Sequence, residues 1–161
     1  MKIISFIALL LVSSSAFSQH EGDSVYRRCP VAIKDTATGN NYFIEHQSAT
    51  VKTYRNKGNY TIVIEQKNQF FTIFFQVRSF STKRKSTYSI STDANSNGEL
   101  SAKYSFRSGA SVAFIDVSSG KAEVTYDKAT KLWHIKLTGL IANMGDTRVT
   151  YFKATADFYI R

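Results

Sequence analysis

Residues 120–161 read GKAEVTYDKATKLWHIKLTGLIANMGDTRVTYFKATADFYIR, and this stretch decides the fold. Apolar and polar side chains alternate within Gly120–Asp127, Leu132–Ile141 and Arg148–Arg161. A period of two is typical of a strand with one face on a core and the other in water. The connectors at residues 128–130 and 143–146 suit turns, so we expect an antiparallel meander. The side chains expected to face the core are Ala122, Val124, Tyr126, Trp133, Ile135, Leu137, Phe152, Ala154, Ala156, Phe158 and Ile160.

Short segments of similar character fill the chain before this meander, and none has a sustained helical period. We expect strands at Val25–Lys34, Tyr42–His46, Thr50–Arg55, Tyr60–Gln66, Gln69–Arg78, Ser86–Thr92, Glu99–Arg107 and Ser111–Val117. Pro30 should bend the first strand or keep it at an edge. A turn at residues 118–120 should lead into the meander. The sequence therefore predicts one all-β domain, an antiparallel β-sandwich of about nine or ten strands, with an up-and-down, lipocalin-like β-barrel as the alternative.

The N-terminus has the pattern of a secretory signal peptide. Lys2 supplies a positive start, Ile3–Val12 is an apolar run, and small residues at 16–18 suit cleavage before Gln19. The apolar run is shorter than the roughly 20 residues of a membrane span, and no later segment approaches that length. We expect residues 1–18 to be removed and residues 19–161 to form a single exported domain, periplasmic or extracellular.

Cysteine usage limits the covalent chemistry. Cys29 is the sole cysteine of the sequence, so an internal disulfide is impossible. The sequence favours a structural or simply unmodified thiol over a lipid anchor or an intermolecular disulfide.

The charge balance indicates the kind of partner. The formal net charge is +9, and the signal peptide accounts for only one lysine of it. After export, the abundant polyanions are envelope lipids, polysaccharides and extracellular DNA. Charge alone predicts attraction to such partners and does not identify a site.

The densest positive cluster is a candidate polyanion site. It consists of Arg78, Lys83, Arg84 and Lys85 in a serine-rich loop, where guanidinium and ammonium groups could hold phosphate or sulfate. Phe80 and Tyr88 lie nearby, as a surface for single-stranded nucleic acid requires. No nucleic-acid-binding fold signature accompanies them, and a solvated loop is the alternative.

One local pattern resembles the start of a calcium-binding loop. Oxygen-bearing side chains alternate at Asp93, Asn95, Asn97 and Glu99, with a glycine at position 98. The acid that should close an EF-hand loop falls on Tyr104, and flanking helices are not expected. An ordinary polar hairpin turn is therefore the alternative. Zinc-type ligand spacings are missing from the sequence, so calcium is the one cofactor considered.

The segment Phe70–Val77 is apolar on both faces. Phe71, Ile73, Phe75 and Val77 share one face, and Phe70 and Phe74 lie on the other. Such a strand is usually central, but it can also form the wall of a ligand cavity. Phe70 and Phe74 are therefore candidate ligand-wall residues.

Catalytic motifs are missing from the sequence. The histidines are His20, His46 and His134, and no serine lies in a nucleophile elbow. The leading hypothesis is therefore a non-enzymatic binding or envelope-associated module. The alternatives are a carrier of a small apolar ligand inside a barrel and a hydrolase that acts on envelope polymers.

The second half of the chain resembles a group of small exported bacterial β-rich proteins and lipoproteins of unknown function. The resemblance lies in Ser86–Ile90, Gly120–Asp127, Leu132–Leu140 with its Thr-Gly pair, and Thr155–Phe158. The glycine of the first motif and the lipid-anchoring cysteine of many such proteins are missing here. The resemblance implies a β fold and export, and it implies no activity.

Overall fold

The computed structural model describes residues 22–26, 29–45, 47–144 and 149–161, and in this part of the chain eleven strands form one sheet. The predicted signal peptide, His20 and His46 lie outside the described residues. The strands are β1 (Gly22–Tyr26), β2 (Val31–Asp35), β3 (Asn41–Phe43), β4 (Ala49–Asn56), β5 (Asn59–Gln66), β6 (Gln69–Phe75), β7 (Ser86–Ile90), β8 (Glu99–Ser108), β9 (Ser111–Asp127), β10 (Leu132–Asn143) and β11 (Thr150–Ile160).

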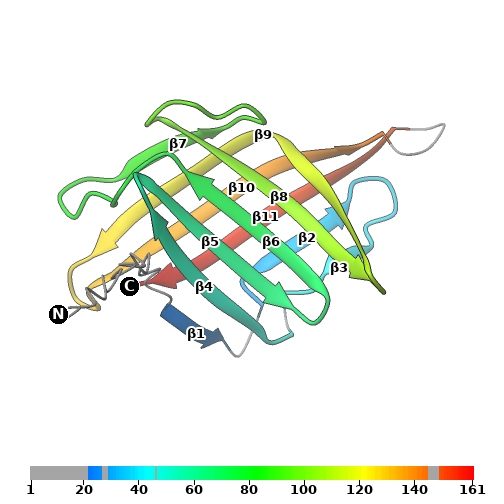
Figure 1. Ribbon diagram of the computed structural model, residues 1–161, viewed down its shortest axis with the longest axis horizontal. Helices are drawn as coiled ribbons and strands as arrows, with labels where there is room; N and C mark the ends of the chain where they lie inside the picture. The colour runs from blue at the N-terminus through cyan, green and yellow to red at the C-terminus, as the bar shows by residue number, and fades with distance from the viewer. Residues whose placement is uncertain (1–21, 27–28, 46, 145–148) are drawn as a thin grey trace, which may run out of the picture.

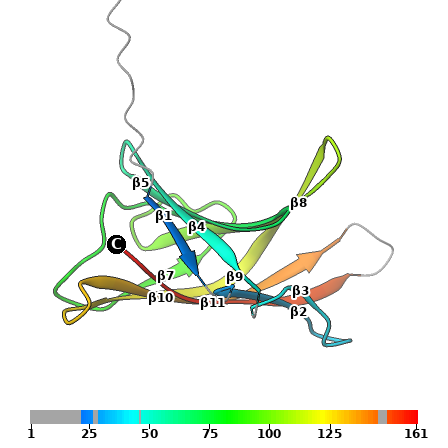
Figure 2. The ribbon, with the colours of Figure 1, turned by 90° about the horizontal axis from the view of Figure 1, so that it is seen from below.

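The sheet is strongly curled into a half-barrel, with the strand order β1-β4-β5-β6-β8-β7-β9-β10-β11-β2-β3 (Figure 1). Seen from below, one part of the sheet lies over the other, and β8 and β9 join the two (Figure 2). The predicted two-sheet sandwich is therefore wrong. The alternative, an up-and-down barrel, does not describe the sheet either, because β2 and β3 follow β11 in it. The sheet is mixed, since β7 pairs with β8 in parallel.

The pairing of β9 explains why the strands form one sheet and not the two sheets of the predicted sandwich. Its first part, residues 111–116, pairs with β8, while the rest pairs with β7 and β10. The predicted turn at residues 118–120 is wrong, because Gly120 takes a φ of +141° and the strand continues. A register shift between Leu140 and Ile141 of β10 accompanies this bend. Glycines and bulges inside strands commonly bend a sheet in this way.

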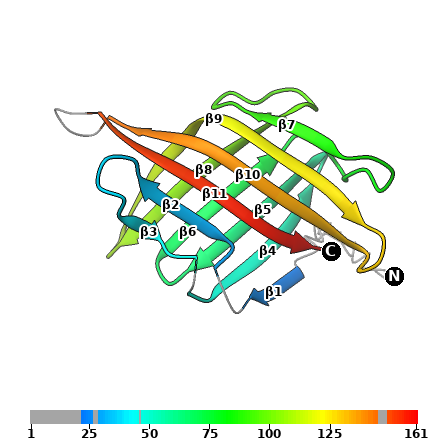
Figure 3. The same cartoon turned by 180° about the vertical axis from the view of Figure 1, so that it is seen from behind.

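The core fills the concave face. The inward side chains of β5 and β6, such as Ile64 and Phe71, are fully buried, as are Ile135 and Leu137 of β10. Phe158 of β11 is buried as well, which confirms the alternation predicted for the closing meander. Fully burying a side chain of this kind contributes about 1.5–3 kcal/mol. Viewed from behind, β9, β10, β11 and β2 lie side by side in front of β4, β5 and β6 (Figure 3).

The start of the chain differs from the prediction. Val25–Lys34 is not one strand: β1 pairs with β4, whereas β2 pairs with β11 at the other side of the sheet. Pro30 lies between them, and its carbonyl accepts the N–H of Asp157. Proline has no N–H to donate to a ladder, and Pro30 lies outside both strands.

Candidate functional site

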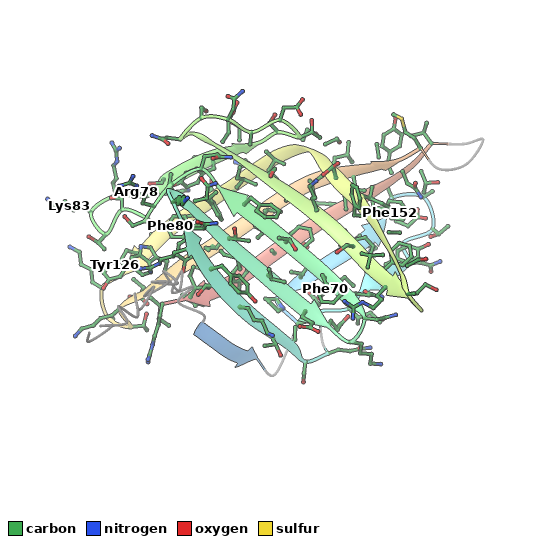
Figure 4. All side chains as sticks on the ribbon, viewed as in Figure 1. Phe70, Arg78, Phe80, Lys83, Tyr126 and Phe152 are labelled. Atoms are coloured by element: carbon green, nitrogen blue, oxygen red, sulfur yellow. The ribbon has the colours of Figure 1, made fainter. Side chains whose placement is uncertain are left out.

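One end of the half-barrel is closed by an aromatic cluster. Phe80, in the loop of residues 76–85 between β6 and β7, is 6% exposed. Its ring centroid lies 4.9 Å from that of Tyr60, 4.8 Å from Phe75, 6.2 Å from Tyr88 and 6.3 Å from Trp133. The loop therefore fills this end with an aromatic side chain. Figure 4 shows Phe80 and Tyr126 at this end and Phe152 at the opposite one.

The opposite end opens into a pocket of about 430 Å³. Aliphatic and aromatic side chains of five strands form most of its wall: Ile33 of β2, Tyr104 and Phe106 of β8, Ile115 of β9, Ile141 of β10 and Phe152 of β11. All of these strands turn one face toward the concave side of the sheet. The pocket is thus the unfilled end of the core.

Amide groups supply the polar part of this pocket. Oε1 of Gln69 is buried and accepts no hydrogen bond from any described residue. The side chain of Asn68 is engaged, because its Nδ2 donates to the carbonyl of Arg107 at 2.8 Å. A buried acceptor without a donor costs free energy.

Exposed apolar side chains lie at this end of the half-barrel, on β3 and beside the β10–β11 connection (Figure 1). Tyr42 is 46% exposed and stands with its ring edge-on to Phe152, 5.3 Å between centroids. Met144 and Val149, which flank the connection between β10 and β11, are 74% and 50% exposed. Apolar side chains gathered in this way commonly mark a ligand or partner surface.

The predicted ligand-wall residues lie on the other face of the sheet. Phe71, Ile73 and Phe75 point into the core, so Phe70 and Phe74 point outward and are half-buried. The guanidinium of Arg107 lies 5.9 Å from the ring centroid of Phe70. Neither Phe70 nor Phe74 lines the 430 Å³ pocket. The residues that do line it, such as Ile115, carry no sequence signal beyond ordinary alternation.

The predicted polyanion residues gather at the closed end. Arg78, Lys83 and Arg84 are exposed, while Lys85 forms an ion pair of 2.7 Å with Glu123. This contact is the main reason why the pKa of Glu123 lies below its usual value. The stacking surface expected from Phe80 and Tyr88 is not present, because both rings are buried in the aromatic cluster. Neither ring is therefore accessible for stacking with a nucleic-acid base.

The candidate calcium residues form a loop that is closed by its own hydrogen bonds. Oε2 of Glu99 accepts the N–H of Asn95 at 3.0 Å, and the N–H of Glu99 donates to the carbonyl of Ser96. The first of these bonds is the main cause of the lowered pKa of Glu99. Asp93 and Asn97 are exposed. Within the described residues, no three His, Cys, Asp or Glu side chains come close enough together to hold a metal ion.

His134 lies on the outer face of β10. Its Nε2 forms a hydrogen bond with Oδ1 of Asp157, its ring stacks on Tyr159 at 4.3 Å, and Lys136 approaches the same carboxylate at 3.6 Å. Neither the open-end pocket nor the polar hollow beside the basic loop is lined by His134. A hydrolase site centred on this residue stays a prediction.

The comparisons with known proteins give no family for this chain. The described residues include no helix with the length and hydropathy needed to cross a membrane. The resemblance to small exported bacterial proteins stays a prediction. No protein-family model matches the sequence, and neither the curated proteins nor the solved structures gave a significant match.

Proposed function

We propose that this protein is an exported, non-enzymatic binding protein that carries a small apolar molecule in the pocket at the open end of the half-barrel. The observation that carries the proposal is the pocket itself. Its volume of about 430 Å³ falls within the roughly 300–1,000 Å³ typical of small-molecule sites. Its wall of isoleucine, tyrosine and phenylalanine side chains is also typical of such sites.

The lining defines the chemistry of the ligand. An apolar body gains about 25 cal/mol for each Å² that it removes from water against the wall. The amide side chains of Asn68 and Gln69 are the polar lining residues of the β5–β6 hairpin, so the ligand should be mostly apolar and carry one polar N–H or O–H group. A long-chain alcohol or an aromatic amine has this combination.

A neutral fluorescent probe tests the proposal. N-phenyl-1-naphthylamine is apolar, carries one N–H and brightens when it leaves water. We expect saturable binding of one probe per chain, and displacement of the probe by 1-dodecanol. Ile115→Phe, which places a larger side chain in the pocket, should weaken probe binding at least fivefold. Gln69→Leu should weaken it about threefold or more.

The neighbouring residue on the same strand supplies the matched control. Phe114 points to the outer face, where the ammonium of Lys103 lies 5.0 Å from its ring centroid. Phe114→Ala should therefore leave probe affinity unchanged. Probe binding that does not saturate, or that falls equally in Phe114→Ala and Ile115→Phe, would rule out the pocket as the carrier site.

A further inference from the structure

The closed end of the half-barrel collects cationic side chains from parts of the chain that are distant in sequence. Two of these residues contact Tyr60 of the aromatic cluster. The Tyr60 hydroxyl donates to the backbone carbonyl of Arg161, and the guanidinium of Arg55 lies 5.2 Å from the centroid of the Tyr60 ring. Arg78 lies against the turn at Gly58. Lys131 lies in the turn between β9 and β10, two residues before Trp133, whose ring is 6.3 Å from that of Phe80. No carboxylate of the described residues forms an ion pair with Arg78, Lys83 or Arg84.

A polar hollow of about 470 Å³ lies beside this basic end, between the loop of residues 76–85 and the β7–β8 connection. Arg84 provides positive charge on one side, next to Lys85, which is paired with Glu123 at 2.7 Å. Most of the other lining residues are polar: Ser79, Ser81, Ser86, Thr87 and Asn97. The hollow therefore offers cations together with uncharged donors and acceptors, a set that suits a sugar carrying an anionic group.

The backbone of the basic loop is held in place. Oγ of Ser81 accepts the N–H groups of Lys83 at 3.2 Å and of Arg84 at 3.4 Å. Phe80, immediately before it, is fixed in the aromatic cluster. A loop anchored at both points loses less conformational entropy when it binds, so its charges are pre-organised for a ligand.

Two other polyanions fit this end less well. A membrane surface is best held by cations combined with apolar side chains that enter the lipid. The most exposed large apolar side chains, Met144 and Phe114, lie elsewhere, at the β10–β11 connection and on the β8–β9 hairpin. Single-stranded nucleic acid needs accessible rings for its bases, and Phe80 and Tyr88 are buried.

We propose that the basic end and its polar hollow bind an anionic polysaccharide. Arg84 holds a sulfate, phosphate or carboxylate group in the hollow, beside the ion pair of Lys85 with Glu123, and Asn97 with the surrounding hydroxyls binds the sugar. Arg78 and Lys83 attract neighbouring anionic groups of the polymer. This site is separate from the apolar pocket, so each can fail its test without the other.

Fluorescence anisotropy with labelled dextran sulfate, and with neutral dextran of the same length, tests the proposal on the purified protein. We expect saturable binding of dextran sulfate that weakens as salt rises, and no binding of dextran. Lys83→Glu combined with Arg84→Glu should weaken binding at least tenfold. Asn97→Ala, which changes no charge, should weaken it about threefold or more.

A second pair of lysines gives a charge-matched control. Lys34 and Lys153 face each other on β2 and β11, away from the basic end, and both are exposed. Lys34→Glu combined with Lys153→Glu should change the affinity less than threefold. An equal loss in both double variants would show diffuse charge attraction and overturn the proposal, as would an unaltered affinity in Asn97→Ala. Tighter binding to phosphatidylglycerol vesicles or to oligo(dT) than to dextran sulfate would assign this end to a membrane or to nucleic acid instead.

Discussion

Gly120 and Gly139 lie directly opposite each other in the β9–β10 ladder, and neither position has room for a Cβ atom. A Cβ on Gly120 would stand 2.2 Å from the carbonyl oxygen of Thr138, and one on Gly139 would stand 2.4 Å from Cγ1 of Val117. The two backbones approach this closely where β9 passes from β8 to β7 and β10. The glycine pair therefore allows the bend that makes the sheet a half-barrel.

We expect Gly120→Ala to lower the free energy of unfolding by about 2–4 kcal/mol, because the new methyl group meets backbone and φ is +141°. Gly98→Ala is the control. A Cβ at Gly98 meets nothing within 4 Å, so this variant should stay within about 0.5 kcal/mol of the parent. Urea unfolding measures both. Equal stability of the two variants would mean that the sheet bends without the glycine pair.

Local alternation predicted the strands well, because the period of two depends only on neighbouring residues. The segments around Ile135 and Phe158 show the expected burial. Strand pairing was not predictable in the same way: alternation has the same appearance in a sandwich, a barrel or a curled sheet. Glycine is common in turns, so the sequence predicts a turn at Gly120, whereas its role within a continuous strand depends on the distant Gly139.

The sequence identified one of the two surfaces on which the proposals rest, and its function stays a prediction. The basic loop could be identified from the sequence because its charged residues are adjacent there. In the structure, Lys83 and Arg84 are both exposed. The apolar pocket could not be predicted from the sequence, because residues such as Ile33 and Phe152 come together only when β2 pairs with β11. The apolar residues on both faces of the segment around Phe70 indicated a central strand, as β6 is. They did not indicate which face of that strand lies on the concave side of the sheet.

Phe80 should contribute much more to stability than an exposed phenylalanine. Phe80→Ala removes a buried ring that contacts four aromatic neighbours, and we expect a loss of about 3–5 kcal/mol in urea unfolding. The emission of Trp133, whose ring lies 6.3 Å from Phe80, should shift to longer wavelength as water enters. Phe114→Ala, at a position 63% exposed, should cost less than about 1 kcal/mol. An unshifted tryptophan spectrum in Phe80→Ala would show that the loop does not close this end.

The thiol of Cys29 should react slowly in the folded protein. The side chain is 1% exposed, and burial raises its pKa from 9.0 to about 11. At pH 8 about one thiol in a thousand is then ionised, against about one in ten when the chain is unfolded. Reaction with 5,5′-dithiobis(2-nitrobenzoate) should be at least about 100-fold slower in buffer than in guanidinium chloride. Complete labelling of the native protein within seconds would contradict the buried position of Cys29. That buried position favours an unmodified thiol over a lipid anchor.

Asp35 should make stability depend on pH below about pH 4. Its Oδ1 accepts the N–H groups of Thr38 at 3.0 Å and Ala37 at 2.7 Å, and these bonds lower its pKa below 3.8. Because the folded-state pKa is the lower one, this stabilisation is present above pH 3.8 and is lost as the pH falls through the folded-state value. The difference in unfolding free energy between the parent and Asp35→Asn should therefore be largest at neutral pH and should vanish in acid. Asp35→Ala should remain less stable than the parent at every pH, since it also lacks the acceptor oxygen. Urea titrations between pH 2 and pH 7 measure these differences, and a gap between the parent and Asp35→Asn that does not change with pH would refute the assignment.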